Sequence, residues 1–134
     1  MFVASRSDAT SGDDRLKADL FELRQTDRTV FLTLIREPRP MEGELLDGDP
    51  GGVFELLDRV PGINVVVDCG NVPVCFSSTV VFFIRLWKKT VANHGRIAFC
   101  NASPHLLQEF EVLHLNGMWP MFGTLSEAIE HVEK

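Results

Sequence analysis

The sequence predicts an α/β fold, with a sheet that begins as an N-terminal hairpin and continues through parallel strands. Three observations predict it. Two short runs of β-branched and aromatic residues come before residue 36 with turn chemistry between them. Helical and strand patterns then alternate from residue 52 to the end. Turn signals rich in Gly and Pro separate several of them, which favours parallel strands joined by helical crossovers.

The elements follow in a simple order. A hairpin is expected over 20–35, and a Pro-, Gly- and acid-rich loop over 36–52. The next part should contain helices over 52–60, 77–93, 101–113 and 125–134, with strands over 63–69, 96–100 and 118–122. The strand at 63–69 is continuously apolar, which predicts burial on both faces. Pro120 confines the last strand to an edge or to a strand end.

Capping residues mark several helix ends. Ser103 followed by Pro104 predicts an N-cap and a first helical residue. Thr124 and Glu127 have the spacing of a capping box. Gly95 stands where a helix starting near residue 77 would need a left-handed C-terminal cap.

Composition limits the function classes. The 134 residues suit one domain, which we place at 18–134, after a Ser-, Asp-, Thr- and Gly-rich stretch at 1–17 that reads as a flexible tail. The net charge is −6, with 13 basic and 19 acidic residues, which argues against nucleic-acid binding. No apolar run approaches the roughly 20 residues of a membrane span. We therefore expect a cytoplasmic protein without a membrane or nucleic-acid partner.

The helix that starts at Ser77 raises the main functional question. Ser77 is placed to act as N-cap, its hydroxyl accepting from the backbone N–H of Thr79 or Val80. A helical wheel puts a core face at Val80, Phe83, Ile84, Trp87 and Val91 and leaves Phe82 on the polar side beside Arg85. An exposed serine there could gain a phosphate, which helix N-termini favour. Alternatively, it is only a cap.

From residue 65 onwards the chain resembles a STAS domain, the fold of bacterial anti-sigma factor antagonists. The resemblance is carried by Asp68-Cys69-Gly70, the turn at 72–80, Gly95, "IAFCNASP" at 97–104, Leu115 and "TLSEAI" at 124–129. It implies a STAS-like fold, a mixed sheet of four to five strands with about four helices mainly on one side.

The resemblance also implies a function. In this family a serine, here Ser77, is phosphorylated by a partner anti-sigma factor that is also a protein kinase. The unphosphorylated form binds that partner and frees the sigma factor, and phosphate abolishes binding. We therefore expect a non-enzymatic regulatory module of transcription, with Ser78 as the next phosphorylation candidate. Its expected partner-binding residues are Phe76, Ser77, Ser78, Thr79, Phe82 and Arg85. Neither a cofactor nor a metal is expected.

Two positions depart from the family pattern and keep an alternative open. Phe76 stands where an acidic residue usually precedes the serine, and Thr79 where a glycine usually follows it. A STAS module that docks on signalling proteins without phosphorylation is the alternative. An exposed Phe-rich turn would also favour weak self-association.

The cysteines and one acidic residue at a strand end raise other classes of function. Cys69, Cys75 and Cys100 lack the spacing of a zinc knuckle or redox pair and are expected to be reduced and packed. A thiol enzyme or redox sensor using Cys75, or Cys69, is nevertheless the second alternative. Asp68 at a strand end raises a response-regulator acid pocket, although the neighbouring acids and lysine that this pocket needs are not in place.

Overall fold

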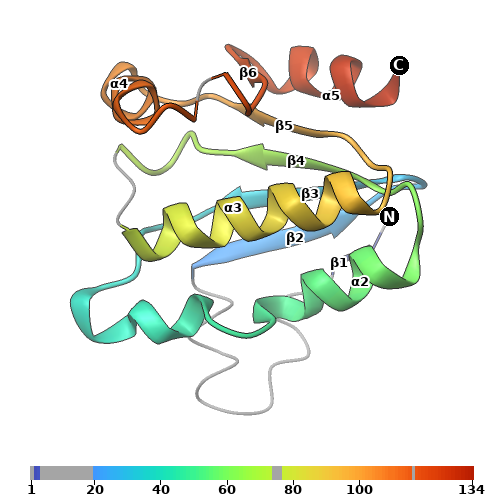
Figure 1. The fold of residues 1–134 in the computed structure, drawn as a ribbon, viewed down its shortest axis with the longest axis horizontal. Helices are drawn as coiled ribbons and strands as arrows, with labels where there is room; N and C mark the ends of the chain where they lie inside the picture. The colour runs from blue at the N-terminus through green and yellow to red at the C-terminus, as the bar shows by residue number, and fades with distance from the viewer. Residues whose placement is uncertain (1, 4–19, 74–76, 116) are drawn as a thin grey trace.

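The protein folds around a single sheet. The structure is a computed structural model, and it describes residues 2–3, 20–73, 77–115 and 117–134. The sheet has the order β1-β2-β3-β4-β5-β6. The first two pairings are antiparallel and the other three are parallel. The strands are β1 Phe2–Val3, β2 Phe21–Gln25, β3 Thr29–Leu34, β4 Asn64–Asp68, β5 Ile97–Cys100 and β6 Met121–Phe122. This confirms the predicted hairpin and parallel crossovers (Figure 1).

The sheet is one strand larger than the expected four to five. The extra strand is β1, which pairs Phe2 with Gln25 and Val3 with Arg24 on the free edge of β2. These two apolar residues belong to the stretch that the sequence predicts as a tail, and the rest of that stretch lies outside the described residues. Two residues are too few for a periodic pattern, so composition could not reveal this strand.

The helices divide unequally between the two faces of the sheet. They are the 3₁₀ segments η2 Pro40–Leu46 and η3 Pro50–Gly52, and the α-helices α2 Val53–Arg59, α3 Ser77–Ala92, α4 Pro104–Val112 and α5 Leu125–Glu133. Residues of α2, α3 and α4 share the larger core with the sheet, whereas α5 packs in a smaller core on the other face. The expectation that the helices lie mainly on one side is confirmed.

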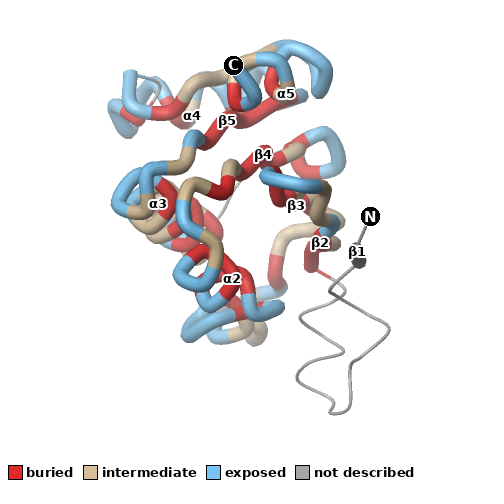
Figure 2. The backbone as a smooth tube through the Cα atoms, turned by 90° about the vertical axis from the view of Figure 1, so that its right-hand side faces the viewer, coloured by how far each residue is buried: buried red, intermediate tan, exposed pale blue. Residues whose placement is uncertain are grey.

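Strand β4 is buried on both faces, as its continuous apolar run predicts. Val65 and Val67 point into the larger core, and Val66 points into the smaller one beside Ala128 and Val132 of α5. Successive side chains on a strand point to opposite faces, so one strand serves both cores. Figure 2 shows the buried strands β4 and β5 between the α3 layer and α5.

The two predicted helix starts in the C-terminal part are confirmed. The Ser103 hydroxyl accepts a hydrogen bond from the backbone N–H of Leu106 at 3.0 Å, and Pro104 begins α4. At α5, the Thr124 hydroxyl accepts from the Glu127 N–H at 3.2 Å, and the Glu127 carboxylate accepts from the Thr124 N–H at 3.1 Å. Local sequence determines both ends because each cap spans only four residues.

The prediction that Gly95 is the left-handed cap of α3 is wrong by one residue. His94 has the positive φ, at 67°, and the N–H of Gly95 bonds to the Thr90 carbonyl at 2.9 Å, as in a Schellman motif. Gly95 is needed for a different reason. A Cβ at this position would lie 2.0 Å from the carbonyl oxygen of Ile63, so the chain just before β4 leaves no room for a side chain.

Candidate functional site

The candidate site lies at the start of α3, on the side of the sheet where the parallel strands have their C-terminal ends. Ser77 is the first described residue of the helix, and Phe76 before it lies outside the described residues. Ser77 is exposed and Ser78 is half-buried. Within the described part of the chain, neither hydroxyl makes a hydrogen bond. Ser77 therefore does not cap its helix in the predicted way, and its oxygen is accessible.

A shallow hollow of about 250 Å³ lies beside the two serines. Its walls come from α3 and from the end of η2 with the two residues that follow it. Arg85 is the one cation and Asp47 the one anion among its described lining residues, which are Leu46, Asp47, Gly48, Ser77, Ser78, Val81, Phe82 and Arg85. The 36–52 region, expected to be only a loop, thus forms one wall of the site.

Arg85 is engaged within its own chain. Its guanidinium donates to the carbonyl of Leu46 at 3.1 Å and to the carbonyl of Gly48. The same group lies over the Phe54 ring of α2, 4.3 Å from the ring centroid. It therefore binds the chain after η2 to the helix. Its predicted role in contacting a partner stays a prediction.

Thr79 is also used internally. Its side chain is 1% exposed, and its hydroxyl donates to both oxygens of the Glu37 carboxylate, at 2.9 and 3.0 Å. The prediction that Thr79 offers its side chain to a partner is therefore wrong. The residue at the position of the family glycine instead fixes the chain after β3 against α3, through a contact between residues 42 apart.

The prediction that Phe82 is an exposed contact residue is wrong as well. Phe82 is 1% exposed, and its ring stacks on Phe21 of β2 at 5.8 Å and meets Phe54 of α2 edge-on at 5.9 Å. Because α3 packs against both the sheet and α2, its buried face is rotated from the expected one. That face consists of Thr79, Phe82, Phe83, Leu86 and Thr90.

The helical wheel placed Phe82 on the polar side because Arg85 and Lys89 lie near it, and the structure shows why these charges do not mark an exposed face. Arg85 lies over Phe54, and the Lys89 ammonium pairs with the Asp58 carboxylate of α2 at 3.0 Å. Long basic side chains can cover apolar surface with their stems while their charged ends reach a partner. The Arg85 and Lys89 side chains therefore lie along α2. Phe82, which is their neighbour on the helical wheel, lies in the core.

Val81 is the apolar residue that sequence reasoning missed. It is 54% exposed and lines the hollow, one helical turn after Ser77. Ser77, Val81 and Arg85 stand at i, i+4 and i+8, so they form one row along α3. That spacing is visible in the sequence, but Val81 is not among the site residues predicted from it.

An ion pair stiffens the chain that forms the other wall. The guanidinium of Arg36 donates to both carboxylate oxygens of Glu42, at 2.8 and 3.2 Å, and the Arg39 N–H donates to the same carboxylate at 2.9 Å. These bonds, that of Arg36 first, lower the pKa of Glu42 from 4.5 to about 2. The carboxylate therefore stays charged, and the ion pair intact, well below neutral pH.

Comparison with known proteins identifies the domain. A family model for the STAS domain matches residues 21–128. The chain belongs to the STAS family. Among curated proteins, none matches the sequence significantly.

Solved structures share the STAS fold of this chain. A candidate anti-sigma factor antagonist from Thermotoga maritima has a TM-score of 0.72 at 19% identity, covering 85% of this chain and 95% of that one. The unphosphorylated anti-sigma factor antagonist SpoIIAA has 0.68 at 24% identity, covering 84% and 96%. A STAS protein from Planctomyces limnophilus has 0.67 at 17% identity, covering 85% and 98%. The predicted resemblance and fold class are therefore confirmed.

The two thiols that the structure describes in this STAS domain are packed, as expected. Burial and, next, the nearby charges of Cys100 and Asp68 raise the pKa of Cys69 far above its ordinary value. Burial and then Asp68 raise the pKa of Cys100 from 9.0 to about 12. Neither group forms the thiolate that a nucleophile or redox centre needs at neutral pH. Cys75 lies outside the described residues.

Thiol labelling at pH 7 tests whether Cys69 and Cys100 are buried and protonated. We expect Cys69 and Cys100 to react with an alkylating reagent at least about tenfold more slowly in the native protein than in urea, because both are protonated and buried. Peptide mass analysis after timed labelling measures each cysteine separately. Fast native labelling of either one would overturn this assignment, and fast labelling of Cys75 would favour the thiol alternative.

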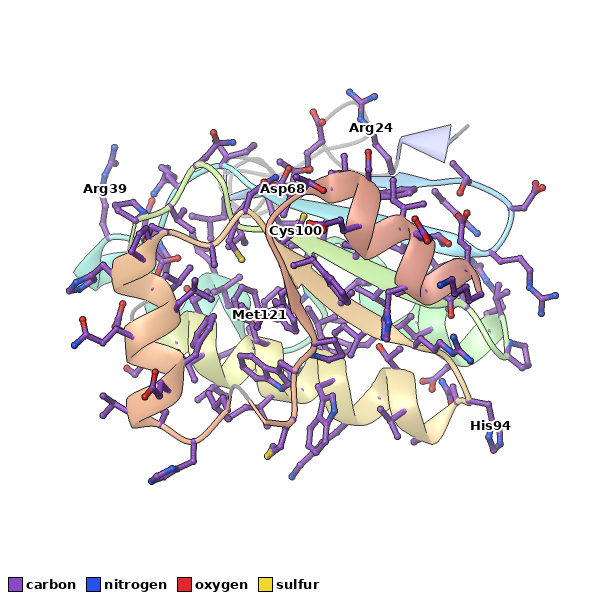
Figure 3. The ribbon with its side chains drawn as sticks, turned by 90° about the horizontal axis from the view of Figure 1, so that it is seen from above. Arg24, Arg39, Asp68, His94, Cys100 and Met121 are labelled. Carbon is purple, nitrogen blue, oxygen red and sulfur yellow. The ribbon has the colours of Figure 1, made fainter. Side chains whose placement is uncertain are left out.

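Asp68 has a structural role at the end of β4. Its Oδ1 accepts from the Gly70 N–H at 2.9 Å and from the Asn101 side-chain amide at 3.1 Å, so it joins the ends of β4 and β5. Figure 3 shows Asp68 close to Cys100 of β5. Across the described ranges, no group of three His, Cys, Asp or Glu side chains could hold a metal ion. No described helix is long and apolar enough to cross a membrane.

Proposed function

We propose that this STAS domain is a non-enzymatic anti-sigma factor antagonist of the bacterial cytoplasm. It docks on an anti-sigma factor that is also a serine kinase, and phosphorylation at Ser77 switches the docking. The docking face consists of the start of α3 and the hollow beside it. Ser77 and Val81 supply the accessible groups there, in place of the buried Thr79 and Phe82.

One observation carries this proposal: Ser77 is exposed in the first turn of a 16-residue helix, and its hydroxyl makes no hydrogen bond to any described residue. A kinase needs an accessible hydroxyl, and this one stands beside a hollow and the exposed Val81. The helix dipole and the free N–H groups of the first turn favour a phosphate at this end. Added charge of about −1.5 to −2 beside the exposed apolar Val81 then opposes docking on an apolar or acidic partner.

Proteins of the same fold support such a cycle. SpoIIAA has been solved in an unphosphorylated form and, from Bacillus, in a phosphorylated form with a TM-score of 0.62 to this chain. The latter match is 24% identical and covers 84% of this chain and 98% of the other. A STAS domain of this shape therefore accommodates both states.

A phosphorylation-independent STAS scaffold is the second candidate function. The Thr79–Glu37 contact favours it, because the position that the family keeps as glycine is filled here by a side chain that ties two segments together. A docking face held in one shape in this way could bind its partner constitutively. Weak self-association through the same face belongs to this second candidate.

Mass analysis of the protein from its native host separates the two candidates. The tryptic peptide of residues 60–85 contains both serines, and fragment ions distinguish Ser77 from Ser78. We expect phosphate on Ser77 in part of the population, none in Ser77→Ala, and an unchanged amount in the matched control Ser78→Ala. Absence of phosphate in every growth condition would contradict the switch and favour the scaffold.

A further inference from the structure

Residues 36–48, which we call the strap, cross the start of α3 and are attached to it near both ends. Near the first end, the Glu37 carboxylate accepts from the Thr79 hydroxyl. At the second, the Arg85 guanidinium donates to the carbonyls of Leu46 and Gly48. The hollow beside Ser77 lies between α3 and the second end, so the strap forms one wall of the candidate docking face.

The two attachments differ in chemistry. Thr79 and Glu37 form a hydroxyl–carboxylate contact in a part-buried place. Arg85 binds two neutral carbonyls and lies at the hollow that Ser77 also lines. A phosphate carries about two negative charges and three acceptor oxygens, so it competes strongly with carbonyls for a guanidinium. The Arg85 attachment is therefore the one whose donor a phosphate in the hollow would compete for directly.

The geometry of α3 brings Arg85 within reach of that phosphate. Ser77 and Arg85 are eight residues apart on one helical row, a separation of about 12 Å along the axis. Helical side chains lean toward the N-terminus, so the Arg85 side chain extends along α3 toward Ser77. Both residues line the same hollow, and Arg85 can turn toward a phosphoryl group there once its bonds to the strap break. Asp47 on the strap side of the hollow repels the same phosphate.

We propose that Arg85 is the internal receptor for a phosphate on Ser77 and that this capture releases the second end of the strap. The Glu37–Thr79 attachment remains, so the strap opens at one end only. The inference rests on the proposed function, because it concerns phosphorylated Ser77. Phosphorylation would then change the shape of the docking face as well as its charge.

Hydrogen exchange on the full chain tests this, with phosphoserine inserted at residue 77 during translation. The amide of Asp47 bonds to the Glu44 carbonyl, and that of Glu42 bonds to the Arg39 carbonyl. We expect exchange at Asp47 to become about tenfold faster with phosphoserine, because its end of the strap is released. Exchange at Glu42 and in β4 should not change. Unchanged exchange at Asp47, or faster exchange in β4 as well, would overturn the proposal.

Two controls isolate the role of Arg85. Phosphoserine at Ser126 adds the same charge to the first turn of α5, on the opposite face of the sheet, and should leave Asp47 unaffected. In Arg85→Gln the amide of Asp47 should already exchange faster, and phosphoserine at residue 77 should add nothing. If phosphoserine still accelerates exchange in Arg85→Gln, repulsion by Asp47 alone explains the release and the receptor role is refuted.

This experiment and the test of the proposed function can fail separately. Translation supplies the phosphate, so the result does not depend on a kinase in the native host. If Ser77 is unmodified in the host but phosphoserine still releases the strap, the proposed phosphorylation switch is refuted and the receptor role of Arg85 is supported. Phosphate on Ser77 in the host, without strap release by phosphoserine, would support the natural switch and refute the receptor role of Arg85.

Discussion

Replacing Phe82 with alanine is expected to lower the free energy of unfolding by about 3–5 kcal/mol. The ring is 1% exposed and packs on Phe21, Phe54 and Phe83, with centroid distances of 5.8, 5.9 and 6.3 Å. Truncation removes contacts with the sheet and with α2 together and leaves a cavity where three elements meet. Denaturant unfolding followed by fluorescence or circular dichroism measures the change.

The neighbouring residue provides a matched control. Val81 is 54% exposed in the same turn of α3, so Val81→Ala should alter the free energy of unfolding by less than about 0.5 kcal/mol. It should instead weaken partner binding if the start of α3 is the docking face. Unchanged stability in Phe82→Ala, with weaker partner binding, would restore Phe82 to the exposed surface and contradict its place in the core.

Replacing Gly95 with alanine is expected to destabilise the protein by about 3 kcal/mol. The new Cβ would lie 2.0 Å from the Ile63 carbonyl oxygen and 3.0 Å from its carbon. Both are backbone atoms, so no side-chain rotation relieves the clash. The chain must shift where the end of α3 passes the start of β4, and there the Arg96 carbonyl accepts the N–H of Val65 at 2.8 Å.

A second glycine shows that the effect is local. Gly117 is exposed, and a Cβ built there meets no atom within 4 Å. Gly117→Ala should therefore change the free energy of unfolding by less than about 0.5 kcal/mol in the same denaturant experiment. Equal effects of the two substitutions would show that the clash with Ile63 does not control the effect at Gly95.

The residues that hold α3 in place differ from those that form the proposed docking face. Phe82 and Gly95 hold α3 against α2 and β4, whereas Ser77, Val81 and the strap form the accessible face. Because α3 supplies both sets, its packing determines where Ser77 is presented. Destabilised variants of Phe82 would lower partner binding indirectly, so binding should be compared at equal folded fractions.

Short-range patterns were sufficient for much of the fold. The order of helices and strands, the caps at Ser103 and Thr124, and the two-sided burial of β4 were all predicted correctly. Each depends on residues within a few positions of one another. The location of Ser77 at the start of α3 was predicted for the same reason. The β1 pairing was not predicted, because its two residues join a strand about twenty residues away.

The contacts of the candidate site depend on residues far apart in the chain. Thr79 binds Glu37, 42 positions away, and Arg85 binds the Leu46 carbonyl, 39 positions away. A helical wheel contains no information about α2 or the strap, so it could not show that Phe82 is buried or that Arg85 is engaged. By itself, the sequence determined the STAS fold and the place of Ser77 at the start of a helix. Only the tertiary structure decided which side of α3 is covered, because a helix packed against both a sheet and another helix has a wider, rotated buried face.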